Sequence, residues 1–408
     1  MLHDRNFFPS RDFLPRVCIS HNVFPWGGTP LITTVLRNIF TKNLSVKRDE
    51  RVLIFTDRPA PRELLDGRAA EQRTRLSCIA FLAAEIGKTV AREVVCLEYA
   101  SAGAHGVEPP AMAWEKAYGR KAVAALRKHR LLGRLLAKRM TDKELRTAED
   151  IIRSHKADAV DAVIALSHFS TSHTRFRDML TRVCGARYAS MPLFDVQMLE
   201  GPMHVDWKAL AARTRKVAAA LAGAEFISIK TPNGTDISFS VTGRVAGVDT
   251  GMLNAPGAFG NLPAGEVYLA PVEGTAKGQL VLAWAPEREL RSAVMLTVRN
   301  GLVEDVVGRD TYALDLEKKL SEQIENRNIS EVGIGTNDMA KRPDNILESE
   351  KILGTIHIAL GDNSSFGGKV QTPFHQDFIF FRPTVQMTGR KGKKTVLMKQ
   401  GKFAEGVL

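Results

Sequence analysis

Short apolar runs alternate with amphipathic segments along the first half of the chain. Residues 29–46, TPLITTVLRNIFTKNLSV, have apolar positions at helical spacing, and residues 50–57, ERVLIFTD, form a short apolar run that ends at Asp57. The run DAVDAVIALSHFS at 158–170 leads into STSHTRFRDMLTRVCG, where a serine or threonine can cap the next helix. Strands that alternate with helices are typical of an α/β fold. We therefore predict an N-terminal α/β domain with a mostly parallel sheet.

The pattern changes near residue 224 to strands joined by tight turns. Asn-Gly pairs at 233–234 and 300–301 each lie between β-rich segments, which predicts β-hairpins. Residues 312–326 read as a helix, and residues 393–408 as another hairpin. A chain of 408 residues is longer than one hydrophobic core usually holds. We predict two domains, residues 1–224 and a C-terminal β-rich α+β domain at 225–408 that carries the metal site.

The formal net charge of +12 raises the question of a nucleic-acid partner. The densest basic segment is 119–139, GRKAVAALRKHRLLGRLLAKR, where apolar residues recur at helical spacing between the arginines and lysines. That pattern predicts a helix with one buried and one solvated face. Because no nucleic-acid fold signature accompanies the charge, we predict no nucleic-acid partner.

The sequence also argues against several other classes of protein. No run approaches about 18 apolar residues, and the charged, aromatic start does not resemble a signal peptide, so we predict a cytoplasmic protein without a membrane partner. The four cysteines contain no CxxC pair, which favours reduced thiols. The absence of a Walker loop, a GxGxxG fingerprint and a GxSxG elbow excludes nucleotide-binding and serine-hydrolase motifs.

Two histidines and an aspartate near the C-terminus are candidate metal ligands. In FHQDFIFF, an extended backbone places His375 and Asp377 on one face, since residues two apart share a face of a strand. The glycine-rich connection GDNSSFGG allows a chain reversal that brings His357 close to them. Such nitrogen and oxygen donors suit zinc, manganese, cobalt or ferrous iron. The alternative is a core histidine at 357 and a simple pair between His375 and Asp377.

Two isolated glutamates extend the candidate site. Glu266 lies in a loop rich in glycine and proline that leads into a strand, and Glu331 stands at the entry to the apolar segment EVGIG. An ordinary position at an exposed strand edge remains the alternative for Glu266. With the two histidines and the aspartate, these glutamates suffice for a pair of metal ions that share a bridging water.

The motifs NLPAGEVYLAP, SEVGIG, HIALG and HQD occur in the order found in the aminopeptidase T/aminopeptidase S family of metallo-aminopeptidases, which this chain resembles over residues 225–380. The resemblance implies a homodimer and five metal ligands, namely Glu266, Glu331, His357, His375 and Asp377. The aminopeptidases have a tyrosine after HIALG, where this chain has Ser364. The same C-terminal motifs also resemble those of the 2,5-dihydroxypyridine dioxygenases, in which two histidines and an aspartate hold one ferrous ion.

Three functions follow as hypotheses. In a metallo-aminopeptidase, our first choice, two ions of zinc, cobalt or manganese activate a water that attacks the peptide, and Glu350 or Glu348 carries the proton. In a ring-cleaving dioxygenase, one Fe(II) binds a hydroxylated pyridine or similar aromatic, while Glu266 and Glu331 surround its ligands. The third hypothesis is a binding protein that has lost its catalytic activity.

Three histidines of the first half are candidates for substrate binding. His168 and His173 lie in the segment expected after a parallel strand, where loops often meet ligands. His204 lies just ahead of the predicted domain junction, where a cleft would open. A capping, solvent-exposed or simple connecting role is the alternative for these residues.

Overall fold

The computed structural model describes residues 30–61 and 63–408. The chain divides into two compact units. Unit 1 contains the described residues up to His204 together with Gly251–Leu262, and unit 2 contains Val205–Thr250 and Pro263–Leu408. Compactness alone does not identify domains that fold independently, so the domain boundary at residue 224 stays a prediction.

A parallel five-stranded sheet forms the centre of unit 1. Every neighbouring pair of its strands is parallel, as the alternation of helical and extended segments predicts. The order across the sheet is β2 (Glu93–Ala100), β1 (Arg51–Arg58), β3 (Ala162–Ala165), β4 (Arg187–Ser190) and β8 (Phe259–Asn261). The edge strand β8 comes from the segment that returns to unit 1 after residue 250, which the sequence pattern did not indicate.

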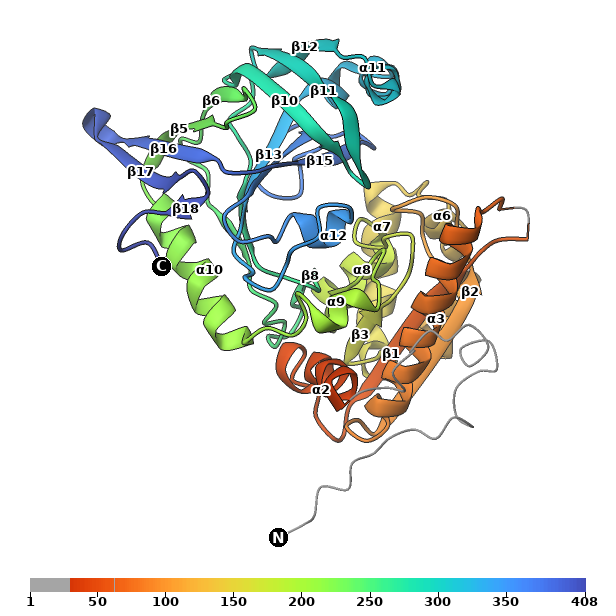
Figure 1. Ribbon diagram of the computed structural model, residues 1–408. Coiled ribbons are helices and arrows are strands. Elements are labelled where there is room, and N and C mark those ends of the chain that lie inside the picture. The colour runs from red at the N-terminus through yellow and green to blue at the C-terminus, as the bar shows by residue number, and fades with distance from the viewer. Residues whose placement is uncertain (1–29, 62) are drawn as a thin grey trace. The chain divides into compact units, whose positions relative to one another are not determined.

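Helices cover both faces of this sheet. Leu53 and Phe55 of β1 belong to a hydrophobic core shared with residues of α4, α5, α7 and α8. Because successive side chains of a strand point to opposite faces, Val52 and Ile54 face the other side, where α3 packs along β1 and β2 (Figure 1). The helical segments of unit 1 are α2 (Pro30–Asn38), η2 (Ile39–Asn43), α3 (Gly67–Gly87), α4 (Ala111–Tyr118), α5 (Arg120–Lys128), α6 (Leu132–Leu136), α7 (Asp142–Ser154), η3 (Lys156–Asp158), α8 (Arg175–Met179), η4 (Leu180–Cys184) and α9 (Gln197–Glu200).

The basic segment 119–139 forms two short helices, α5 and α6, where the sequence predicts one. Arg130 between them has a φ of 58°, a left-handed conformation that an α-helix cannot contain. Each helix still buries its apolar side, with Val123 and Leu126 in α5 and Leu135 in α6 fully buried. The prediction of a buried and a solvated face is therefore confirmed, and the prediction of a continuous helix is wrong.

Unit 2 contains two antiparallel sheets. The eight-stranded sheet includes the predicted hairpins β5/β6, β11/β12 and β17/β18. Its order is β12 (Leu302–Val307), β11 (Arg288–Arg299), β10 (Lys277–Ala285), β6 (Asp236–Ser240), β5 (Ala224–Lys230), β16 (Thr384–Gly389), β17 (Lys394–Lys399) and β18 (Lys402–Phe403). The five-stranded sheet has the order β15 (His375–Phe380), β14 (Ile356–Gly361), β13 (Ile329–Gly335), β9 (Glu266–Leu269) and β7 (Gly247–Asp249).

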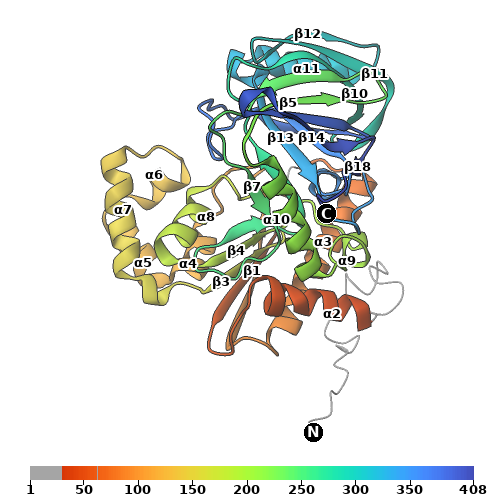
Figure 2. The same cartoon turned by 90° about the vertical axis from the view of Figure 1, so that its left-hand side faces the viewer.

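One hydrophobic core joins the two sheets of unit 2. Ile227 and Phe239 from the larger sheet and Val332, Ile358 and Phe378 from the smaller sheet belong to the same buried cluster. α10 (Trp207–Leu221) packs on β9 and on β7, and Figure 2 shows β7 beside it. The remaining elements are α11 (Thr311–Ser321), η5 (Ile324–Arg327), α12 (Ile346–Ser349) and η6 (Arg390–Gly392). The predicted fold class, an α/β half followed by a β-rich α+β half, is confirmed.

Two other sequence predictions concern thiols and membranes. Cys96 and Cys184 are free thiols, whereas Cys78 is disulfide-bonded, so the prediction of four reduced cysteines is wrong for Cys78. Pairing requires two Cβ atoms about 4 Å apart, a distance that spacing along the chain does not reveal. Within 30–61 and 63–408, every helix is too short or too polar to cross a membrane.

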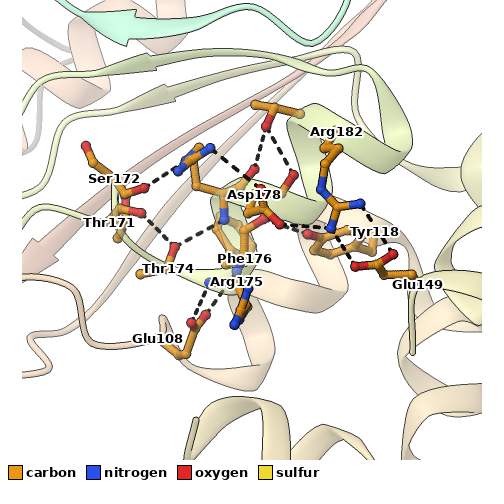
Figure 3. A network of polar contacts seen from close by, with 12 residues as sticks. Glu108, Tyr118, Glu149, Thr171, Ser172, Thr174, Arg175, Phe176, Asp178 and Arg182 are labelled. Carbon is orange, nitrogen blue, oxygen red and sulfur yellow. Dashed lines mark hydrogen bonds and ion pairs between the residues drawn. The ribbon is translucent and has the colours of Figure 1, made fainter. Parts of the chain in front are cut away.

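A buried carboxylate holds the start of α8 (Figure 3). The backbone N–H groups of Arg175 and Phe176 donate to the two oxygens of Glu108, at 2.6 and 3.0 Å. Thr174 precedes the helix and accepts from the N–H of Arg177 at 3.1 Å. The first N–H groups of a helix have no partner inside it, so these side chains satisfy donors that would otherwise be buried and unpaired.

Replacing Glu108 with alanine should lower the free energy of unfolding by about 1–3 kcal/mol, because two buried N–H groups lose their acceptor. The matched control is Glu149→Ala, which removes an ion pair to Arg182, a side chain that is 50% exposed. Such a pair contributes about 0–1 kcal/mol. Urea unfolding followed by fluorescence measures both variants, and equal destabilisation by the two would contradict the capping role of Glu108.

Candidate metal centre

One face of the five-stranded sheet collects the predicted ligands. Asp377 of β15 lies opposite Ala359 of β14, which lies opposite Glu331 of β13, so these three side chains form one row across the sheet. In the neighbouring row, His357 of β14 lies opposite Gly333 of β13. Residues directly opposite one another project from the same face of a sheet. The intervening apolar residues of the same strands point the other way, into the core of unit 2.

Small residues between the ligands leave room on this face. A Cβ atom built on Gly333 would lie 2.0 Å from both Cε1 and Nε2 of His357, so the imidazole ring occupies the space above the glycine. Ala359, which lies between Asp377 and Glu331 in the row, has only a methyl group and so also leaves space above the sheet. The sheet thus provides a recess in which long polar side chains approach each other.

The five predicted ligands form one cluster, which we call the acidic cluster. The distances are 3.4 Å from His357 Nε2 to both Glu331 Oε1 and Glu266 Oε2. From His375 Nε2, Glu331 Oε2 lies at 3.4 Å and Asp377 Oδ2 at 3.5 Å. Glu331 therefore lies between the two histidines, with one oxygen toward each.

These distances suit shared coordination better than direct hydrogen bonds. Hydrogen bonds to nitrogen usually measure about 2.7–3.2 Å, whereas two donors about 2.1 Å from one ion at a tetrahedral angle lie about 3.4 Å apart. Asp377 Oδ1 and Glu266 Oε2 are buried and, among the described residues, have no hydrogen-bond partner. A buried carboxylate oxygen without a partner is costly unless a cation binds it. Glu331, His375 and Asp377 offer three ligand atoms within 4.8 Å of one another, so the cluster fits a metal ion.

The backbone orients His375 toward the cluster. Its Nδ1 lies 2.8 Å from the carbonyl oxygen of Asp362, which leaves Nε2 facing Glu331 and Asp377. Metal-binding histidines commonly use their second nitrogen in this way. His375 is also the most open member of the cluster, with 29% of its side chain exposed, whereas the side chain of His357 is 2% exposed.

Lys351 is a member of the site that the sequence analysis missed. Its Nζ donates to Glu266 Oε1 at 2.6 Å and to Glu350 Oε2 at 2.8 Å, and its side chain is fully buried. Glu350, a predicted catalytic residue, thus joins the cluster through Lys351. The only signal in the sequence was the segment ESEK at 348–351, in which the lysine follows Glu350 directly and Glu348 by three positions. Such a charged segment usually lies on a solvated surface.

The mutual charges of the cluster move the pKa of its members. Burial alone would lower the pKa of His357, but its contact with Glu331 and the nearby Glu266 raise it to about 9. Burial would raise the pKa of Asp377, yet His375 holds it below its ordinary value. Burial would likewise lower the pKa of Lys351, but Glu266 and Glu350 keep it well above the usual range. Lys351 thus brings a positive charge next to Glu266 and Glu350.

The family model of 2,5-dihydroxypyridine 5,6-dioxygenase matches residues 118–404, more than half of the chain, and the match includes the whole acidic cluster. The chain belongs to the 2,5-dihydroxypyridine 5,6-dioxygenase family. It is thus a member of an enzyme family. Our first choice of function was the aminopeptidase, and the family match favours the dioxygenase alternative over it.

Solved structures share the fold of this dioxygenase family member. The 2,5-dihydroxypyridine dioxygenase from Pseudomonas putida KT2440 is 17% identical, with a TM-score of 0.63, over 92% of this chain and 97% of that chain. Wild-type AmpT from Thermus thermophilus is 14% identical, with a TM-score of 0.57, over 92% of this chain and 100% of that chain. At these identities the likeness concerns the fold alone. The sequence has no match among curated proteins.

Other residues with predicted roles lie elsewhere in this dioxygenase family member. Glu348 accepts from the backbone N–H groups of Lys341 and Arg342, at 2.9 and 3.1 Å, which ties a loop to α12. The histidines predicted to bind substrate, His168, His173 and His204, belong to unit 1. The catalytic role of Glu348 and the substrate-binding roles of these histidines stay predictions, as does the homodimer.

Proposed function

We propose that this protein is a metal-dependent dioxygenase that opens the ring of a dihydroxylated pyridine or a similar aromatic compound. The observation that carries the proposal is the family match, which spans the complete acidic cluster. A cluster that combines two imidazoles with carboxylates resembles the donor sets that hold a single ferrous ion in non-haem oxygenases.

In this proposal His357, His375 and Asp377 would hold the ion, and Glu331, with one oxygen 3.4 Å from each imidazole, lies beside it. A bound ferrous ion supplies the one-electron chemistry that reactions with dioxygen require. Asp362 keeps His375 in the orientation that exposes Nε2 to the ion, through its carbonyl oxygen at 2.8 Å.

Aromatic side chains beside the cluster support a flat, ring-shaped substrate. The ring of Phe366 lies edge-on to that of His375, with 5.9 Å between the ring centroids, and edge-on to that of Tyr268 at the same separation. Tyr268 lies opposite Gly333 in the sheet and so shares the face of the cluster. Aromatic surfaces favour stacked or edge-to-face contact with another ring. We propose that the substrate ring lies against Phe366, on the open side of His375.

The test combines metal analysis with two activity assays on the full-length protein. Protein purified without chelator and loaded with Fe(II) under argon should contain one iron per chain and consume dioxygen when 2,5-dihydroxypyridine is added. The loss of ring absorbance should match the dioxygen consumed. Cleavage of an aminoacyl amide by protein that contains two zinc, cobalt or manganese ions, without dioxygen consumption, would support the aminopeptidase and contradict the proposal.

A further inference from the structure

Phe366, the aromatic side chain beside His375, lies in the loop between β14 and β15. This loop contains residues 362–374, and the ring of Phe366 is half-buried. Loops are usually more mobile than the strands they connect, so a ring in this loop keeps one position only if the backbone around it is held. The contacts of Asn363, in the same loop, supply that restraint.

Asn363 is fully buried, and its oxygens bind the loop from within. Its backbone carbonyl accepts from the N–H of Phe366 at 3.3 Å and from the N–H of Gly368 at 2.9 Å. Its side-chain oxygen accepts from the N–H of Val370 at 2.9 Å. A Cβ atom on Gly368 would lie 1.9 Å from Cγ of Asn363, so the loop backbone packs directly against the amide. Asn363 thus fixes the backbone at Phe366 and after it.

Two side chains from other loops of unit 2 hold the same segment from outside. Oε1 of Glu273 accepts from the side-chain amide of Asn363 at 3.1 Å and from the N–H of Lys369 at 2.7 Å. Arg244 donates to the second oxygen of Glu273 at 2.5 Å and to the carbonyl of Gly367. Because buried polar groups cost free energy when they are left unpaired, this network favours one arrangement of the loop.

The base of the loop is fixed by other contacts. The N–H of Asp362 donates to the carbonyl of Phe374 at 2.8 Å, and its side chain accepts from the N–H of Thr372 at 3.1 Å. These contacts position the Asp362 carbonyl, which lies 2.8 Å from Nδ1 of His375. A change in the middle of the loop should therefore leave the orientation of this histidine intact.

We infer that Asn363 is a positioning residue for the substrate, because it holds the ring of Phe366 beside His375 as a wall for an aromatic ring. This inference rests on the proposed function, in which the substrate ring lies against Phe366. Asparagine suits this place because one amide donates to Glu273 and accepts from Val370. An ionised aspartate has no hydrogen to donate.

The experiment is a double-mutant cycle on the full-length, iron-loaded protein. Calorimetry under argon measures the affinity for 2,5-dihydroxypyridine without turnover. Phe366→Ala removes the wall, and Asn363→Asp removes the donor to Glu273, so each should lower the affinity about 3–10-fold. If Asn363 acts through Phe366, the double variant binds no more weakly than Phe366→Ala. Iron per chain should be the same in all variants.

Two further variants separate this role from a general effect of the substitution. Gly368→Ala adds no charge, yet its methyl group must displace the Asn363 amide, so it should lower the affinity as Asn363→Asp does. The matched control is Asn233→Asp, an exposed turn asparagine whose amide donates to the carbonyl of Val281 at 2.8 Å. The control should bind the compound as the wild type does.

The inference would be overturned by additive losses in the cycle, by wild-type affinity in both Asn363→Asp and Gly368→Ala, or by a parallel loss of iron. These outcomes differ from a failure of the proposed function. A wild type that binds the compound but consumes no dioxygen in air would contradict only that function, and turnover with unaffected variants would contradict only the inference. Absence of binding to the wild type would contradict both.

Discussion

Replacing Asp377 with alanine is expected to lower the affinity for Fe(II) by more than about 100-fold and to abolish dioxygen consumption. Loss of a residue that only supports a ligand typically costs about 10–100-fold in metal affinity, and loss of a ligand itself should cost more. Asp377 has one oxygen 3.5 Å from His375 Nε2 and a second that is buried without a partner among the described residues. Both features indicate a carboxylate placed for a cation.

The measurement is iron per chain after anaerobic loading and desalting, together with dioxygen uptake. Asp377→Asn serves as a second variant, since it keeps the shape of the side chain and removes its charge. The matched control is Asp236→Ala, an exposed strand aspartate of the same unit that pairs with Lys230 on the surface. Full iron occupancy in Asp377→Ala would reject Asp377 as a ligand.

Replacing Gly333 with alanine is expected to impair iron binding although Gly333 has no side chain to bind a metal. The added methyl group would lie 2.0 Å from the tip of the His357 ring, so the ring must move away from Glu331 and Glu266. We expect a loss of about 10–100-fold in Fe(II) affinity, as for other changes that misplace a ligand. Overpacking should also lower the free energy of unfolding, by about 1–3 kcal/mol.

The control for this variant is Gly133→Ala in α6, because a Cβ at Gly133 would have no atom within 4 Å. Alanine at a helical position should leave iron binding unchanged and stability unchanged or slightly higher. Iron titration and urea unfolding of both variants separate the two effects. Normal iron affinity in a folded Gly333→Ala variant would show that the position of His357 does not matter for the ion.

Local sequence patterns predicted much of the fold. The Asn-Gly pairs at 233–234 and 300–301 marked hairpins because this dipeptide readily adopts the backbone of a tight turn, a property of two residues alone. The basic segment 119–139 was predicted less well, since apolar spacing continues through Arg130 although the helix does not. The return of residues 251–262 to the parallel sheet left no local signal, because strand pairing between distant segments depends on the rest of the fold.

The candidate site likewise contains residues that the sequence predicted and residues that only the fold brings together. His375 and Asp377 could be paired from the sequence because residues two apart on a strand share a face. Glu266 and Glu331 stood out as isolated glutamates beside apolar segments, and the resemblance to known metalloenzymes then implied that they are metal ligands. Neither the spacing of residues nor the family resemblance predicted a role for Gly333 or Lys351. Gly333 leaves space for the ring of His357 on the neighbouring strand, and Lys351 binds Glu266, which lies on a different strand.

By itself the sequence determined the order of helices and strands, the hairpin turns and the types of side chain available for a metal ion, because these depend on residues within a few positions of each other. Only the tertiary structure decided which strands lie side by side and therefore which charges meet. A lysine that would be an ordinary surface residue elsewhere becomes a buried cation here, because the turn after α12 directs its ammonium group onto Glu266 in β9.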